Sequence, residues 1–210
     1  MSKAGLLLLG AGGHARACID VIEQEDRFTV AGLVGLPAEK GTDVLGYPVL
    51  GADADLPELL AQFEHALVTV GQIKTPELRI RLFGIAEEHG RTLPAVISPL
   101  AYVSRHARIG AGTVVLHGAV VNAGASVGRN CIVNSQVLIE HDAEIGDHCH
   151  IATAAAVNSG VHVGAGTFIG SGTCVRQAIR IGERCVIGMG QRVLADCEPG
   201  TRMPPWSGRV

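Results

Sequence analysis

The feature that most constrains the fold is a six-residue repeat that runs from Val103 to Glu198. Every sixth position holds valine or isoleucine without a slip, at Val103, Ile109, Val115, Val121, Val127, Val133, Ile139, Ile145, Ile151, Val157, Val163, Ile169, Val175, Ile181, Ile187 and Val193. The residue four positions later is usually small, with Val137, Val161, Ile179 and Gln191 as the larger exceptions. A period of six fits neither an amphipathic helix nor an ordinary hairpin sheet. It is the period of a hexapeptide β-helix.

Three hexads form one triangular coil of about eighteen residues, in which the aliphatic side chain points inward and the small residue lets the corner close. Each coil covers its predecessor, so stability is roughly a sum over adjacent coils. The repeat supplies about five coils, which exceeds the minimum of about three repeats. We therefore predict a left-handed parallel β-helix over residues 99–210, including a C-terminal tail.

Composition agrees with a thin β-helical interior and excludes several classes of function. Aromatic residues make up only 3% of the chain, and the net charge of −3 predicts neither nucleic-acid binding nor attraction to an anionic membrane. The six cysteines form no CxxC pair, and four occupy the small slot of the repeat, where we interpret them as packing thiols: Cys131, Cys149, Cys185 and Cys197. The N-terminal apolar run is too short for a signal peptide or a membrane span. These features predict a cytoplasmic protein.

Residues 1–98 have a different pattern, in which short apolar runs alternate with amphipathic segments. We expect strands over 6–9, 28–33, 66–70 and 92–97, and helices over 17–25, 56–62 and 76–89. Such alternation predicts a small parallel α/β domain of Rossmann-like type. The domain boundary is expected near Ser98 and Pro99.

The loop over residues 10–15 reads Gly-Ala-Gly-Gly-His-Ala and formally satisfies G-x-G-x-x-G/A between a strand and a helix. Such a loop offers backbone N–H groups and a helix N-terminus to a phosphate. The dinucleotide fingerprint also needs an acidic residue at the end of the second strand. Residues 32–35 contain none, which argues against NAD. Two interpretations remain open: the loop holds a nucleotide diphosphate, or its glycines serve only a tight turn.

The most conspicuous polar interruption of the repeat is His141, followed at once by Asp142. A neutral imidazole can accept a proton on one nitrogen while a carboxylate holds the other N–H, which is the arrangement of a general base. The residues one coil before and after are small and predict a recess around the histidine: Ala123, Gly124, Ser159 and Gly160. The alternative is a surface histidine that is hydrogen-bonded to a loop.

The other histidines of the repeat suggest two further roles. A zinc site of the type in γ-class carbonic anhydrases needs ligands about two coils apart, and no histidine of the repeat has another 36 positions on, so we expect no metal. His150 lies about half a coil beyond His141. It could meet a second substrate at the edge of the β-helix, or it could be a solvated side chain.

The glycine-rich loop, the stretch Ile-Ser-Pro-Leu-Ala-Tyr-Val-Ser over 97–104, the repeat and the Ile-Glu-His-Asp motif over 139–142 together resemble the sugar acetyltransferases of the NeuD/PglD type. The resemblance covers nearly the whole chain. It implies a homotrimer packed through the β-helices, with acetyl-CoA as co-substrate in the groove between subunits. It also implies that the N-terminal domain binds a nucleotide sugar. Within the family, the pattern most resembles enzymes that acetylate the 4-amino group of GDP-perosamine.

The resemblance also implies roles for individual residues. His141 would be the base, and Asp142 would raise its basicity. Three residues would contact acetyl-CoA: His150 at the thioester end, and Ser171 and Met189 along the pantetheine arm. The nucleotide sugar would be held by Gly12, Gly13, His14 and Gly71.

Departures from the family pattern leave alternatives open. Relatives commonly carry an acidic pair where this chain has Val34 and Gly35, and Asn or Asp where it has Gln72, which puts the base and ribose contacts in doubt. The tail also differs, and its Trp206 could cover the adenine of coenzyme A or pack on the last coil. An O-acetyltransferase of the sialic acid type, an enzyme for UDP-linked 4-amino sugars, and a non-catalytic scaffold remain alternatives. We expect direct transfer, because no thiol adjoins His141 in sequence or in the neighbouring coils.

Overall fold

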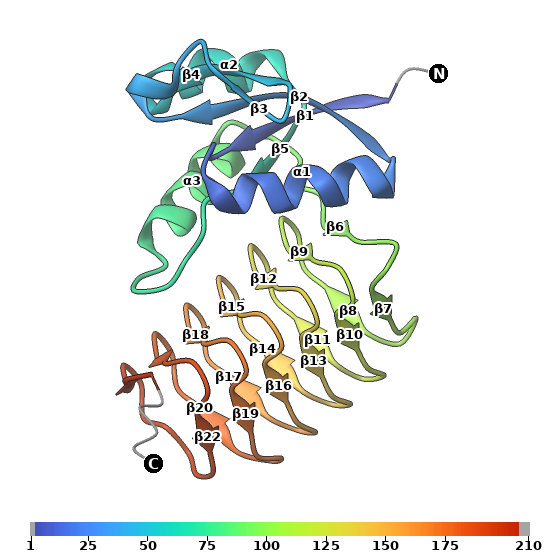
Figure 1. Cartoon of the computed structure of the whole chain (residues 1–210), viewed down its shortest axis with the longest axis vertical. Coiled ribbons are helices and arrows are strands. Elements are labelled where there is room, and N and C mark those ends of the chain that lie inside the picture. The colour runs from blue at the N-terminus through green and yellow to red at the C-terminus, as the bar shows by residue number, and fades with distance from the viewer. Residues whose placement is uncertain (1–2, 206–210) are drawn as a thin grey trace.

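The computed structural model describes residues 3–205 and consists of an α/β domain placed against one face of a parallel β-helix (Figure 1). The predicted fold class is therefore confirmed. Within the described residues, none of the helices combines the length and the hydrophobicity needed to cross a lipid bilayer. Trp206 lies outside the described residues.

The N-terminal sheet has the strand order β3-β4-β2-β1-β5 and is parallel except for the β3–β4 pair. Its strands are β1 (Ala4–Leu9), β2 (Phe28–Gly35), β3 (Asp43–Val44), β4 (Tyr47–Ala52) and β5 (His65–Val68). The leucine run of β1 is buried on both faces, as the sequence predicts for a central parallel strand. The sequence does not predict β3 and β4, which widen the sheet next to β2.

Helices cover both faces of this sheet: α1 (Gly13–Glu25), α2 (Leu56–Gln62) and α3 (Glu77–Glu88), with 3-10 turns η1 (Pro37–Glu39) and η2 (Asp53–Asp55). Apolar side chains of α2 and α3 pack against one face, and those of α1 pack against the other. The α1 cluster continues into Val96, Val114 and Leu116 of the β-helix. One helix is therefore packed between the sheet and the β-helix (Figure 1).

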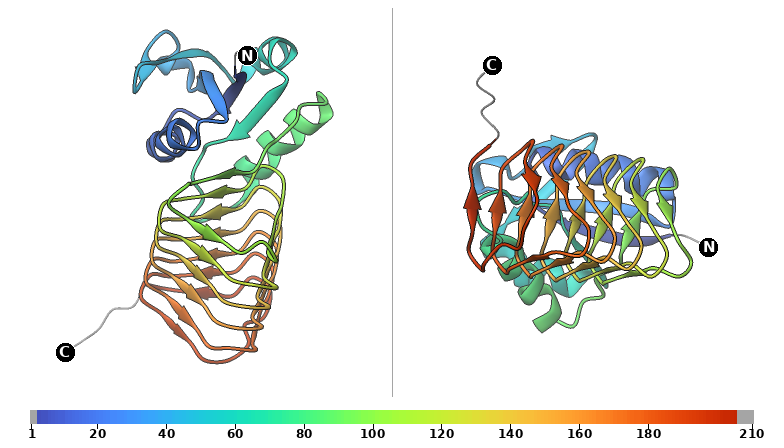
Figure 2. Two further views of the ribbon diagram at one scale, coloured as in Figure 1. Left: turned by 90° about the vertical axis from the view of Figure 1, so that its right-hand side faces the viewer. Right: turned by 90° about the horizontal axis from the view of Figure 1, so that it is seen from below.

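The β-helix has three parallel sheets (Figure 2), which we name faces A, B and C. Face A contains β6 (Val96–Ile97), β9 (Val114–Val115), β12 (Ile132–Val133), β15 (His150–Ile151), β18 (Phe168–Ile169), β21 (Val186–Ile187) and β23 (Arg202–Met203). Face B contains β7 (Tyr102–Val103), β10 (Val120–Val121), β13 (Leu138–Ile139), β16 (Ala156–Val157), β19 (Cys174–Val175) and β22 (Arg192–Val193). Face C contains β8 (Arg108–Ile109), β11 (Ser126–Val127), β14 (Glu144–Ile145), β17 (His162–Val163) and β20 (Arg180–Ile181).

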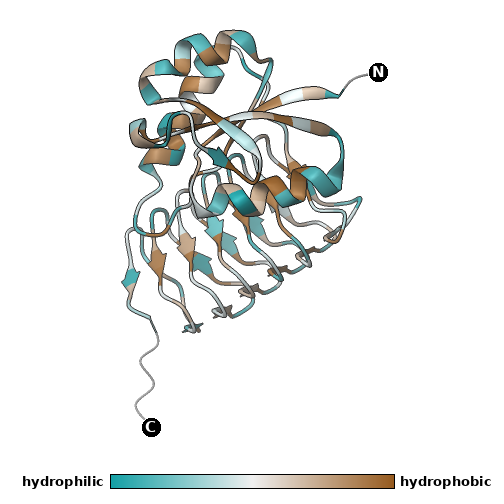
Figure 3. Ribbon diagram, turned by 45° about the horizontal axis from the view of Figure 1, so that its top comes forward, coloured by the Kyte–Doolittle hydropathy of each residue, from teal (hydrophilic) through white to brown (hydrophobic). Residues whose placement is uncertain are grey.

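The strands pair in the register that the repeat predicts, so that Val121 lies beside Ile139 one coil later. The aliphatic column forms one continuous buried cluster, and apolar segments recur in successive coils (Figure 3). The small slot at the edge between faces C and A also has a polar role. Thr113 donates from Oγ1 to the Gly128 carbonyl at 2.7 Å and accepts from the Cys131 N–H at 2.9 Å. A short side chain with a polar tip thus satisfies backbone groups inside the turn.

The segment 92–97 forms a shorter strand than the sequence predicts. Thr92 forms a single parallel bridge with His65 of β5, whereas the strand Val96–Ile97 pairs with β9 of the β-helix. Pro94 explains the difference, because proline has no N–H to donate to a sheet ladder. The β-helix accordingly begins at Val96.

A buried arginine joins the two domains. The Arg79 guanidinium donates to the Val68 and Val70 carbonyls at the end of β5 and, at 2.7 Å, to the Asn130 side-chain oxygen of the β-helix. Burial lowers the pKa of Arg79 to about 10, so the side chain remains charged at neutral pH. Gln72 adds a second link by donating from its side-chain amide to the His148 carbonyl at 3.0 Å. These contacts position the C-terminal edge of the N-terminal sheet over face A.

Candidate active site

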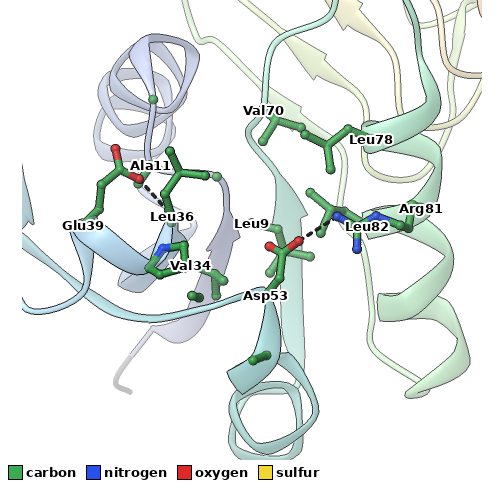
Figure 4. A pocket seen from close by; sticks show the side chains of 16 residues that line it. Leu9, Ala11, Val34, Leu36, Glu39, Asp53, Val70, Leu78, Arg81 and Leu82 are labelled. Carbon is green, nitrogen blue, oxygen red and sulfur yellow. Dashed lines mark hydrogen bonds and ion pairs between the residues drawn. The ribbon is translucent and has the colours of Figure 1, made fainter.

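Two cavities lie at the C-terminal edge of the N-terminal sheet. The first, the sheet-edge cavity, has a volume of about 710 Å³ and is lined by the ends of β1, β2 and β4 and by α3. Figure 4 shows Leu36 and Glu39 on one side of it and Leu78, Arg81 and Leu82 on the other. The second, the junction cavity, has a volume of about 470 Å³ and lies between the N-terminal domain and face A. Ligands of open α/β sheets bind at this edge.

The glycines of the loop over residues 10–15 lack a side chain for different reasons. Gly10 has φ +131°, and a Cβ there would lie 2.7 Å from the backbone nitrogen of Val70, so the fold itself excludes a side chain. A Cβ on Gly12 or Gly13 would meet no protein atom within 4 Å. These two glycines therefore leave open space in front of the N-terminus of α1. No side chain caps that end of the helix, and its first turn holds no acidic residue, so the N–H groups of Gly13 and His14 are available to an anion, whereas that of Ala15 donates to the Gly12 carbonyl at 3.0 Å.

The junction cavity brings together four residues that the sequence assigns to two different ligands. Gly13, His14 and Gly71 come from the N-terminal domain, and His150 comes from β15 on face A. The same cavity is also lined by Ala17, Gln72, Ile73, Leu116 and Asn134. The sequence does not indicate Asn134 as a site residue, because an asparagine after an inward valine is a weak signal.

His14 is held as a neutral imidazole. Burial, and next the charge of Arg79, lower its pKa to about 3. Its Nε2 lies 3.5 Å from the Cys18 thiol one helical turn later, and burial raises the pKa of that thiol to about 12. A protonated thiol can donate to Nε2, and in the tautomer of His14 that accepts this bond the ring proton is on Nδ1. In that tautomer Nδ1–H is available as a donor.

His150 is also neutral, and it is buried. Only 8% of the residue is exposed, so the solvated side chain considered above is not what the structure shows. Its Nδ1–H donates to the Gln72 carbonyl at 2.5 Å, and the Asn134 amide donates to its Nε2 at 3.3 Å. Burial lowers the pKa of His150 to about 4. Because both ring nitrogens have protein partners, the ring suits a fixed contact rather than proton transfer.

These two histidines predict that stability declines as the pH is lowered below about 6.5. Unfolded histidine has a pKa near 6.5, whereas the folded values are about 3 for His14 and about 4 for His150, so between these limits the unfolded state binds more protons. The unfolding free energy should be highest above pH 6.5 and fall by up to about 1.4 kcal/mol per pH unit for each histidine. Urea denaturation over this range should show smaller slopes for His14→Asn and His150→Asn. The exposed His162→Asn is the control, and equal slopes in all three variants would contradict the prediction.

The His141–Asp142 pair lies on the edge between faces B and C. The His141 Nδ1 is 2.9 Å from the Asp142 carboxylate, so the predicted hydrogen bond is present. The side chains of His141 and Asp142 are 60% and 72% exposed. The neighbouring Glu140 carboxylate accepts from the His141 N–H at 3.2 Å and from the Asn122 amide at 2.9 Å. These bonds hold the backbone of His141 beside the Glu140 carboxylate. His141 lines neither of the two cavities, so a single chain does not enclose it.

Ser171 and Met189 lie on the other side of face B, at the edge between faces A and B. They follow β18 and β21, and the Gly190 N–H donates to the Ser171 carbonyl one coil earlier at 2.9 Å. His150 lies on face A itself, in register with Phe168, so of the three predicted acetyl-CoA residues only Ser171 and Met189 lie on this edge, in consecutive coils. Met189 is 59% exposed. Face B separates this edge from His141. One chain alone therefore does not bring the predicted acetyl-CoA residues close to the predicted base.

Metal ligation has no basis within residues 3–205, where no three or more histidine, cysteine, aspartate or glutamate side chains gather as a metal site would need.

Comparisons with known proteins bear on the fold and the family of the chain. The family described as the PglD N-terminal domain matches residues 5–83. A comparison with curated protein sequences gives no significant match. Among solved structures, a perosamine N-acetyltransferase from Caulobacter crescentus, crystallised with CoA and GDP-perosamine as a histidine-to-asparagine mutant, has a TM-score of 0.89 and 34% identity, covering 95% of this chain and 92% of that chain.

Two further structures extend the comparison. The acetyltransferase domain of PglB from Neisseria gonorrhoeae FA1090, in complex with acetyl coenzyme A, has a TM-score of 0.85 and 29% identity, covering 96% of both chains. WeeI from Acinetobacter baumannii AYE has a TM-score of 0.83 over 95% of this chain and 96% of that chain, but at 21% identity it supports the fold alone. Because the identity to the perosamine enzyme extends over nearly the whole of both chains, the protein belongs to the NeuD/PglD-type family of sugar acetyltransferases.

Proposed function

We propose that the protein transfers the acetyl group of acetyl-CoA to the 4-amino group of a nucleotide-linked sugar, with GDP-perosamine as the first candidate acceptor. The observation that carries this proposal is the His141–Asp142 hydrogen bond of 2.9 Å on an exposed edge of the β-helix. The Caulobacter crescentus structures with CoA and GDP-perosamine, at 34% identity, support the choice of acceptor.

The acceptor would extend from the sheet-edge cavity toward the junction cavity. The nucleoside fits the sheet-edge cavity, and its diphosphate would lie in front of Gly12 and Gly13, where the N-terminus of α1 favours negative charge. The sugar would then extend toward the junction cavity, where His14 offers Nδ1–H and Gly71 leaves room beside it. The donor would extend from His150 on face A to the edge between faces A and B, past Ser171 and Met189.

A homotrimer would unite the two halves of the site. The outward column of face B is apolar and partly or fully exposed over its first five strands, at Tyr102, Val120, Leu138, Ala156 and Cys174, and ends in Arg192. Face C, in contrast, presents charged residues such as Arg108, Glu144 and Arg180. An exposed apolar column is typical of an interface between subunits. If three copies of face B surround one axis, the A–B edge of each subunit meets the B–C edge of the next.

The chemistry is direct transfer. His141 Nε2 accepts a proton from the amine as its nitrogen forms a bond to the thioester carbonyl carbon, and Asp142 stabilises the resulting imidazolium. The tetrahedral oxyanion needs a donor such as a backbone N–H. The carbon–sulfur bond then breaks, and the CoA thiolate takes the proton from His141. The products are CoA and the amide.

The test is an assay of the purified protein with acetyl-CoA and GDP-perosamine, monitored by release of the CoA thiol and by the mass of the sugar product. We expect acetylation of the amino sugar and none of its 4-hydroxyl counterpart. A UDP-linked 4-amino sugar is the competing acceptor. Preference for the hydroxyl sugar would contradict N-acetyl transfer, and absence of acetyl-CoA binding would contradict the donor.

A further inference from the structure

A carboxylate occupies the end of β2, although the strand itself ends without an acidic residue. Glu39 lies in η1, and its Oε2 accepts the Leu36 N–H at 2.7 Å. A Cβ on Gly35, the last residue of β2, would be only 2.7 Å from the same oxygen. Gly35 does not have a positive φ, so crowding rather than backbone conformation explains its lack of a side chain, with the Ala11 Cβ at 3.0 Å and the Val49 Cγ1 at 3.2 Å adding to this carboxylate. The chain thus folds Glu39 back into the place of a side chain at position 35.

The position of this carboxylate relates it to the glycine-rich loop. Glu39 lines the sheet-edge cavity together with Gly10, Ala11 and Gly12 (Figure 4). The Gly35 Cβ site that the carboxylate adjoins is also 3.0 Å from the Ala11 side chain. A group that contacts Glu39 would therefore lie directly beside a phosphate at the N-terminus of α1. In a nucleotide, the group next to the phosphate is the ribose.

The carboxylate also has capacity for a ligand. Across residues 3–205, its hydrogen bond comes from Leu36 to Oε2, and it forms no ion pair with lysine, arginine or histidine. The other acidic residue of the cavity, Asp53, is engaged with Arg81 at 2.6 Å. An ionised carboxylate accepts several hydrogen bonds, so Oε1 of Glu39 remains available.

We infer that Glu39 binds the ribose hydroxyls of a ribonucleoside diphosphate, in the role that an acidic residue at the end of the second strand has in dinucleotide-binding folds. The inference rests on the proposed nucleotide-sugar function and deepens it, because it names a residue that selects ribose over deoxyribose. It also accounts for residues 32–35, where the fingerprint acid is missing: the carboxylate is supplied from four residues beyond the strand.

The experiment is isothermal titration calorimetry with GDP and UDP, each paired with its 2′-deoxy form. Wild-type protein should bind the preferred ribonucleotide about tenfold to a hundredfold more tightly than its deoxy form, because hydrogen bonds to a charged group are strong. Glu39→Gln retains an acceptor for the Leu36 N–H, and it should lose most of this preference with an unchanged melting temperature. Glu58→Gln on α2, exposed and away from both cavities, is the control and should behave as wild type.

A rescue variant separates recognition from a change in loop structure. In Gly35→Asp with Glu39→Ala, the strand end itself carries the carboxylate, and the preference for ribose should return; because Ala11 and Val49 lie 3.0 and 3.2 Å from the new Cβ, the melting temperature of this variant is measured alongside. Equal binding of ribo and deoxy nucleotides by the wild type, or full preference in Glu39→Gln, would overturn the inference while leaving the acetyltransferase function intact. Failure of both GDP and UDP to bind would contradict the nucleotide-sugar proposal itself, and the inference with it.

Discussion

Replacing His141 with asparagine is expected to lower kcat about 10²–10⁴-fold, because a placed general base contributes that much to the rate of proton transfer. The amine must lose a proton as it attacks the thioester, and asparagine cannot accept one. Binding should be nearly unchanged, since the ring is 60% exposed and its hydrogen bond is to its neighbour Asp142. The effect should therefore appear in kcat rather than in the dissociation constants.

Steady-state kinetics with both substrates, together with calorimetric binding of acetyl-CoA, would measure this split. The chain offers a matched control in His162, whose Nδ1 lies 3.0 Å from the Glu144 carboxylate on face C. This second exposed histidine–carboxylate pair does not border face B, and His162→Asn should retain wild-type turnover. Wild-type turnover in His141→Asn, or an equal loss in both variants, would remove His141 from the mechanism.

Mixed trimers of two inactive variants are expected to regain activity. His141 and Ser171 lie on opposite edges of face B, so a site assembled between subunits takes His141 from one chain and Ser171 from the next. His141→Asn removes the base, and Ser171→Trp should block the edge expected to hold the pantetheine arm. In a cyclic trimer that contains both variants, one of the three interfaces unites an intact His141 with an intact Ser171, so activity should return to about a third of the wild-type level.

Co-expression with two different affinity tags would provide these trimers, because sequential purification removes those made of one variant alone. Mixed trimers of His141→Asn and His141→Ala are the control and should remain inactive, since every site then lacks the base. If mixed trimers of His141→Asn and Ser171→Trp show only background activity although both variants are folded and trimeric, one chain holds the complete site.

Part of the active site follows from the sequence, and the rest depends on how the domains pack. The motif of His141 and Asp142 and the predicted contact between them need only the local chain. Gly12 and Gly13 were likewise recognisable from their place between a strand and a helix. The proximity of His14 to His150 was not, because it depends on the junction held by Arg79, Gln72 and Asn130, and these residues belong to no periodic pattern.

The carboxylate of Glu39 shows the same limit. The sequence places an acidic residue four positions beyond β2, and only the turn of η1 directs it back to the strand end. The β3–β4 pair was missed for a related reason, since β3 has only two residues and the place of β4 is decided by its pairing with the outer edge of β2. In both cases a few non-local contacts outweigh a weak local signal.

The sequence alone determined the β-helix and the class of α/β domain before it. A period of six repeats the same contacts in every coil, so local spacing is enough to specify the fold. Only the tertiary structure decided which of the candidate residues meet: it buried His150, joined it to His14, and kept His141 on a separate edge. The physical reason is that these relations arise from a single domain junction and from the direction of each face, and neither is repeated along the chain.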